Sequence, residues 1–89
     1  MNSVERVAKR TRELRVKHGL TQEELAGLAD MSEKFLQQIE SRRKKEIWVS
    51  TVERIAAAFS LDLHEFFAPE VPDESTPAKK VISSRVHRK

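Results

Sequence analysis

The stretch "TQEELAGLADMSEKFLQQIE", residues 21–40, contains two short helical patterns separated by Asp30, Met31 and Ser32. Thr21 and Glu24 have the spacing of a capping box, in which each side chain accepts a hydrogen bond from the other residue's backbone N–H at a helix start. The helix that they open turns small or apolar residues to one side: Leu25, Ala26, Leu28 and Ala29. The stretch therefore predicts two short helices joined by a tight turn.

The second of these helices has an apolar and a polar side. Ser32 is a good N-cap for it, and Phe35, Leu36 and Ile39 form its apolar arc. The opposite side, called the polar arc below, carries Glu33, Lys34, Gln37, Gln38 and Ser41. The function of the chain depends on whether this polar arc faces water or a ligand.

Three further helices are predicted on either side of this pair. Residues 4–18 place apolar or small side chains on one helical stripe, and Gly19 supplies a stop. Two more capping boxes predict helix starts further on: Ser50 with Glu53, and Asp62 with Glu65. We therefore expect residues 1–68 to form an all-α domain of five helices.

Arg15 does not fit the pattern of its helix. At 100° per residue it falls inside the apolar stripe, between Val4 and Ala8. Burying a guanidinium group is costly unless an acidic group pairs with it. The stripe therefore predicts a buried acidic partner for Arg15.

Composition excludes several classes of protein. The chain of 89 residues has no cysteine, so a disulfide framework, thiolate zinc sites and thiol nucleophiles are excluded. The longest uncharged apolar run, "IAAAF" at residues 55–59, is far shorter than the roughly 20 residues of a membrane-spanning helix. The three histidines have no metal spacing, and no catalytic pattern is recognisable. We expect a cytoplasmic protein without membrane association, enzymatic activity, metal or cofactor.

Residues 69–89 differ from the rest of the chain. They contain all three prolines and little apolar content, and residues 79–89 hold five basic residues and no acidic one. This composition predicts a flexible basic tail. The tail could act as an arm on nucleic acid, dock a partner protein or only solubilise the chain, and "KKVIS" at residues 79–83 could add a short strand.

Residues 11–67 resemble the Cro/C1-type helix-turn-helix family, also called the XRE family, of phage and bacterial regulators. The resemblance rests on "RELR" before "GLTQEELA", then on "MSEKFLQQIE" and "RIAAAFSLDLHEFF". It implies a five-helix, lambda-repressor-like domain whose third helix enters the DNA major groove. It also implies that Arg15 forms a buried ion pair with Glu40, which would explain the anomaly in the first helix.

The resemblance assigns DNA contacts as well. It implies a phosphate contact from Gln22 and base contacts from Glu33, Lys34, Gln37 and Gln38. Their chemistry is suitable, because glutamine pairs with adenine, lysine with guanine, and glutamate accepts from cytosine N4. Backbone contacts are expected from Ser41, Arg42, Arg43, Lys44 and Lys45, although "RRKK" could also be a solvated loop or a localisation signal.

The sequence departs from the family at three places. Arg42 and Ser60 stand where glycine is usual, and the segment from residue 42 to residue 49 is about one residue longer and lacks the usual proline. An arginine at position 42 predicts either that residue 42 adopts a strained left-handed conformation or that the preceding helix ends differently from the family's. Trp48 lies in the longer segment, and an exposed Trp48 or Phe67 would suit the two-fold interface that this family commonly uses.

We therefore expect a bacterial or phage transcriptional regulator, a repressor that binds a palindromic operator in double-stranded DNA as a homodimer at the nucleoid. Two alternatives remain open. One is an antitoxin-like module that autoregulates and binds a partner protein through its helices or its tail. The other is a controller protein of a restriction-modification system.

Overall fold

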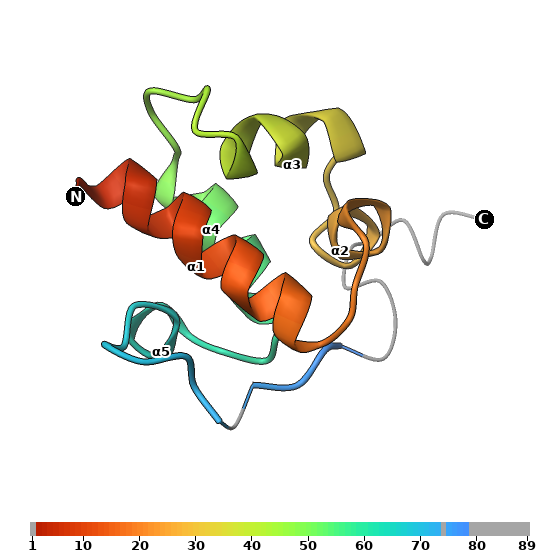
Figure 1. Ribbon diagram of the computed structural model, residues 1–89, viewed down its shortest axis with the longest axis vertical. Helices are drawn as coiled ribbons and strands as arrows, with labels where there is room; N and C mark the ends of the chain where they lie inside the picture. Colours follow the sequence, from red (N-terminus) through yellow and green to blue (C-terminus); the bar gives the residue numbers. More distant parts are fainter. Residues whose placement is uncertain (1, 74, 79–89) are drawn as a thin grey trace.

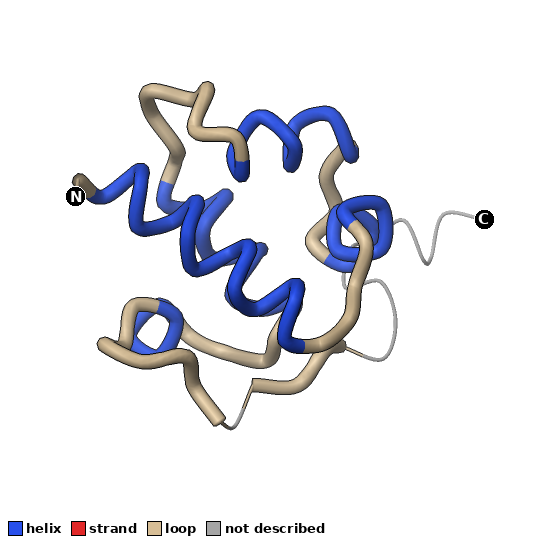
Figure 2. The backbone as a smooth tube through the Cα atoms, viewed as in Figure 1, coloured by secondary structure: helices blue, strands red, loops and turns tan. Residues whose placement is uncertain are grey.

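Five α-helices joined by short connections make up the part of the chain that the structure describes, residues 2–73 and 75–78. The computed structural model places them as α1 Ser3–Lys17, α2 Gln22–Leu28, α3 Glu33–Glu40, α4 Val49–Ala58 and α5 Leu63–Phe66. In Figure 1, α1 crosses in front of α4, α3 lies above α1, and α5 lies below it. Figure 2 shows no strand in the described residues. The prediction of an all-α fold with five helices is confirmed.

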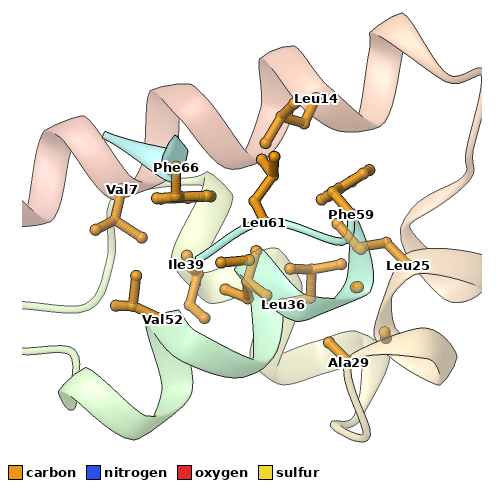
Figure 3. Packing of buried hydrophobic residues seen from close by; sticks show 14 residues of the cluster. Val7, Leu14, Leu25, Ala29, Leu36, Ile39, Val52, Phe59, Leu61 and Phe66 are labelled. Carbon is orange, nitrogen blue, oxygen red and sulfur yellow. The ribbon is translucent and has the colours of Figure 1, made fainter. Parts of the chain in front are cut away.

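One hydrophobic core lies between the helices, and every helix contributes to it (Figure 3). Its largest enclosed apolar side chains are Leu14, Leu25, Leu36, Ile39, Ile55, Phe59 and Phe66. Burying each of these side chains contributes about 1.5–3 kcal/mol. The apolar arc of α3 is thereby fixed against the core, with Leu36 and Ile39 at 0% exposure.

Capping boxes begin three of the helices. The pairs are Asn2–Glu5 at α1, Thr21–Glu24 at α2 and Asp62–Glu65 at α5. The second and third pairs were predicted and are confirmed. The pair at α1 was not predicted, although the spacing of Asn2 and Glu5 is the signal that would have identified it.

The predicted start of α4 at Ser50 is wrong. The helix begins at Val49, with Trp48 as an N-cap that makes no side-chain capping bond. The backbone N–H groups of Thr51 and Val52 donate to the Trp48 carbonyl at 3.0 and 3.2 Å, so Ser50 lies inside the first turn. The Trp48 carbonyl therefore accepts the first bonds of the helix, and the start lies earlier than the capping pattern predicts.

The first four helices end in the same way, with a left-handed residue directly after the C-cap. These residues are Gly19 (φ 67°), Asp30 (φ 60°), Arg42 (φ 65°) and Ser60 (φ 63°). At the end of α3, for example, the N–H of Arg42 donates to Ile39 O at 3.1 Å and the N–H of Arg43 to Gln38 O at 3.0 Å. A left-handed conformation costs an L-residue about 1–2 kcal/mol, so Arg42 stores strain that a glycine would not.

Arg42→Gly should therefore raise the free energy of unfolding by about 0.5–1 kcal/mol. This value is the strain relieved at residue 42 minus the conformational entropy that glycine adds to the unfolded chain. Chemical denaturation measures the change. Ser41→Gly is the matched control, because the C-cap Ser41 has a φ of −83° and gains nothing from glycine. Equal destabilisation by both substitutions would show that Arg42 is not strained.

The described residues that follow α5 lie against the domain. Thr76 N donates to Phe59 O and Ala78 N to Ala58 O, both at 2.9 Å, and Ser75 is only 5% exposed. Lys17 Nζ donates to Pro72 O at 2.7 Å. We call residues 69–73 and 75–78 the strap. The nucleic-acid arm and the possible strand were predicted for residues 79–89, which lie outside the described residues. The docking of a partner protein was predicted for the whole tail after Pro69 and stays a prediction.

His18 joins the strap to the core. Its ring stacks on Phe59 with the centroids 5.6 Å apart, and its Nε2 lies 2.9 Å from Ser75 Oγ. Burial, and secondarily the positive charge of Lys17, lower the pKa of His18 below its ordinary value of 6.5. The folded protein therefore favours the neutral ring.

This shift makes stability depend on pH. Below about pH 6.5 the unfolded chain binds a proton at His18 more readily than the folded chain does, so the free energy of unfolding should fall as the pH is lowered from about 7.5 to about 5.5. Denaturant titrations at several pH values measure this slope. His18→Gln should flatten it, whereas His64→Gln, at an exposed position of α5, should not. An unchanged slope in His18→Gln would assign the effect to other groups.

Candidate nucleic-acid interface

The polar arc of α3 lies on the outside of the molecule. Ser32 caps the helix by accepting from Phe35 N at 3.0 Å, and the core then fixes its rotation. With Leu36 and Ile39 turned inward, the arc is left at the surface. Glu33, Lys34, Gln37 and Ser41 are exposed, and Gln38 is half-buried. Donors and acceptors are therefore presented together along one side of the helix.

A hollow of about 180 Å³ interrupts this surface near the end of α3. It is lined by Lys34, Gln37, Gln38, Ser41 and Arg43. Within the arc, Gln37 Nε2 donates to Glu33 Oε2 at 3.4 Å, a weak bond. The Gln37 side chain can thus reorient toward a ligand at little cost. The lining of the hollow combines amide groups with positive charge.

The basic loop, residues 42–45, follows α3 directly. Arg42, Arg43 and Lys45 are exposed, and Lys44 is half-buried. Lys44 Nζ lies 4.6 Å from the centroid of the Phe35 ring, a cation–π distance. This contact holds positive charge beside the first turn of α3. No local pattern predicts this contact, because residues 35 and 44 meet only through the path of the loop.

Arg15 and Glu40 form an ion pair in the interior. Arg15 Nε lies 2.8 Å from Glu40 Oε2 and Nη2 lies 3.0 Å from Oε1, and the side chains are 13% and 4% exposed. Arg15 Nη1 also donates to Leu20 O at 3.0 Å. Glu40 is therefore the buried acidic partner that Arg15 requires at its position in the apolar stripe. The pair joins the C-terminal end of α3 to α1.

Gln22 takes part in the same network. It is the first residue of α2, and its Nε2 donates to Glu40 Oε1 at 3.1 Å. One carboxylate thus links α1, α2 and α3. Gln22 is half-buried, and its contact with a phosphate stays a prediction.

Within residues 2–73 and 75–78, no group of three histidine, cysteine, aspartate or glutamate side chains is arranged to hold a metal ion. The helices in this part of the chain are also too short or too polar to cross a membrane.

Comparison with known families agrees with this geometry. A family model described as helix-turn-helix matches residues 12–66, which is more than half of the chain. The chain belongs to the Cro/C1-type helix-turn-helix family, and it is a DNA-binding transcriptional regulator of the XRE type. No curated protein matches the sequence.

Proposed function

We propose that this protein is a repressor that binds a palindromic operator as a homodimer, with the polar arc of α3 reading base edges in the major groove. The observation that carries the proposal is the exposure of the arc on a helix whose opposite side is fixed in the core. A groove-lying helix needs both features, because its side chains must reach the bases while its axis stays in place. Repression then requires only that the bound protein cover a promoter on the chromosome.

Four residues of the polar arc have side chains whose chemistry suits base contacts. Gln37 and Gln38 can each give a bidentate pair to adenine, and Lys34 can donate to guanine O6 and N7. Glu33 can accept from cytosine N4, and its bond from Gln37 is weak enough to exchange. Each good pair discriminates between bases by about 1–3 kcal/mol.

The backbone contacts are proposed from the residues around α3. Positive charge lies at the C-terminal end of the helix on exposed Arg42, Arg43 and Lys45. The Lys44 ammonium group lies near the first turn of α3, over the Phe35 ring. Ser41 and Gln22 would add neutral hydrogen bonds to phosphate. Such contacts fix the register of the protein on the duplex and carry no sequence information themselves.

A homodimer is proposed because α3 alone is short. Its eight residues span about 12 Å, enough for only a few base pairs. The described surface also has an apolar area suited to self-association: Trp48 is 76% exposed and Val49 63% exposed. A groove of about 240 Å³, lined in part by Val4, Ile47 and Leu63, lies beside them. Two copies related by a two-fold axis would each bury this area.

Binding-site selection from random DNA, followed by footprinting of the best sequence, tests the proposal. We expect an inverted repeat with half-sites about one helical turn, roughly 34 Å, apart. Sedimentation with that DNA should give two protomers per site. A selected site without inverted symmetry, or one protomer at saturation, would refute the homodimer but leave base reading intact.

Trp48→Ser should weaken the dimer. If the indole is central to the interface, its loss costs about 2 kcal/mol or more, which is roughly a 30-fold rise in the dimer dissociation constant. Analytical ultracentrifugation over a concentration series measures this constant. Glu53→Ser, at an exposed position of α4, is the control and should leave it unchanged. Equal constants for both variants would exclude Trp48 from the interface.

A further inference from the structure

A second surface of the molecule has features of a ligand site that the polar arc does not explain. A groove of about 590 Å³ runs along the outer side of α1 and reaches the end of α3 and the strap. Its apolar part is formed by Ala8, Val16 and Val71. Val16 is 58% exposed, one of the few large apolar side chains at the described surface. We call this the α1 groove.

Positive charge surrounds the α1 groove. Lys9, Arg12, Lys17 and Arg42 line it, and all four are exposed. Its two acids are already engaged. Glu13 pairs with Arg10 at 3.0 Å, and Glu40 pairs with Arg15 at 2.8 Å. Within residues 2–73 and 75–78, no carboxylate forms an ion pair with Lys9, Arg12 or Arg42. The groove therefore combines an apolar floor with a surplus of cations.

From this combination we infer that the α1 groove binds an acidic, apolar segment of a partner protein. An aliphatic or aromatic side chain of the partner would cover Val16 and Val71, and its carboxylates would meet Lys9 and Arg12. The volume lies in the ~300–1,000 Å³ range of sites that enclose small ligands, so a short segment is sufficient. Complementary charge would give such a contact its specificity and its rate of association.

Two other occupants fit less well. The tail of this chain, residues 79–89, has five basic residues and no acidic one, so its charge repels that of the groove. DNA supplies phosphates for the cations but offers little to the apolar floor. The contact proposed here does not depend on the polar arc, and it would let the bound regulator contact a second protein.

A defined peptide tests the inference. The probe is a fluorescein-labelled peptide that repeats Asp-Leu-Glu, and its binding to the full chain is followed by fluorescence anisotropy. One control peptide has serine for leucine, and the other has lysine for both acids. We expect the probe to bind at least about tenfold more tightly than either control, because the groove needs both charge and apolar contact. No binding by the probe, or equal binding by the serine control, would overturn the inference.

Variants locate the contact. Arg12→Glu should weaken binding of the probe by about tenfold or more, and Val16→Ser by about threefold to tenfold. Arg43→Glu is the matched control, because it makes the same change of net charge in the basic loop and should leave the probe's affinity nearly unchanged. Equal losses in Arg12→Glu and Arg43→Glu would mean nonspecific attraction and overturn the site. Loss of DNA affinity in Arg12→Glu, with the probe still bound normally, would make the groove part of the DNA interface instead. Circular dichroism checks that each variant is folded.

Discussion

Arg15→Met will lower the free energy of unfolding by about 3–5 kcal/mol, the largest single effect that we expect in this protein. The substitution keeps an unbranched side chain in the stripe of α1 but leaves the Glu40 carboxylate, 4% exposed, without its cation. Gln22 would remain as its donor at 3.1 Å, and one neutral hydrogen bond does not compensate a buried charge. A domain of this size has only about 5–15 kcal/mol in total, so the variant should be largely unfolded near body temperature.

Thermal and denaturant unfolding measure the loss, and two further variants identify its cause. Arg15→Met combined with Glu40→Leu should recover part of the stability, because no unpaired charge is then buried. Arg12→Met is the matched control, at an exposed position of the same helix, and should change stability by no more than about 0.5 kcal/mol. A melting temperature unchanged in Arg15→Met would show that the pair contributes nothing.

The second large effect is expected in DNA binding. Gln38→Ala or Lys34→Ala should weaken operator binding by about 1–3 kcal/mol and relax the preference at one or two base pairs. Binding to random DNA should change little, because a lost base contact does not affect the phosphates. Arg43→Ala should weaken binding to both DNAs together and reduce the slope of log K against log salt by about one unit, since one fewer counterion is released.

The contrast between these variants is the measurement that matters. Affinities for the selected operator and for a scrambled duplex are compared at several salt concentrations. This comparison distinguishes the contribution of base contacts to affinity from that of phosphate contacts. If Gln37, Gln38 and Lys34 can all be replaced by alanine with the operator preference intact, the polar arc reads no sequence. It would then face water or a protein partner.

Much of the fold could be predicted because its signals are local. Thr21 with Glu24, and Asp62 with Glu65, mark helix starts through bonds that span three residues. Arg15 indirectly predicted a tertiary contact, the buried ion pair, because a charge in an apolar stripe requires an acidic partner elsewhere in the fold. The apolar stripe does not identify that partner, and Glu40 was predicted from the family resemblance alone.

The remaining features depend on residues that meet only in the folded chain. Ser50 has a good capping pattern, yet α4 begins at Val49 and its first backbone bonds go to the Trp48 carbonyl. The strap is polar and rich in proline, so its composition predicted a tail, whereas its backbone donates to the carbonyls of Ala58 and Phe59. The α1 groove combines three distant segments of the chain. Local pattern carries no information about such contacts.

The polar arc and the core occupy opposite sides of α3, and this separation bears on how the protein can change over time. Exposed Lys34 and Gln37 lie outside the hydrophobic cluster, whereas Leu36 and Ile39 belong to it. Substitutions on the outer side can therefore accumulate with little loss of stability. A lineage, or a designer, could redirect such a domain to a new target by altering the outer residues alone and keep the same scaffold throughout.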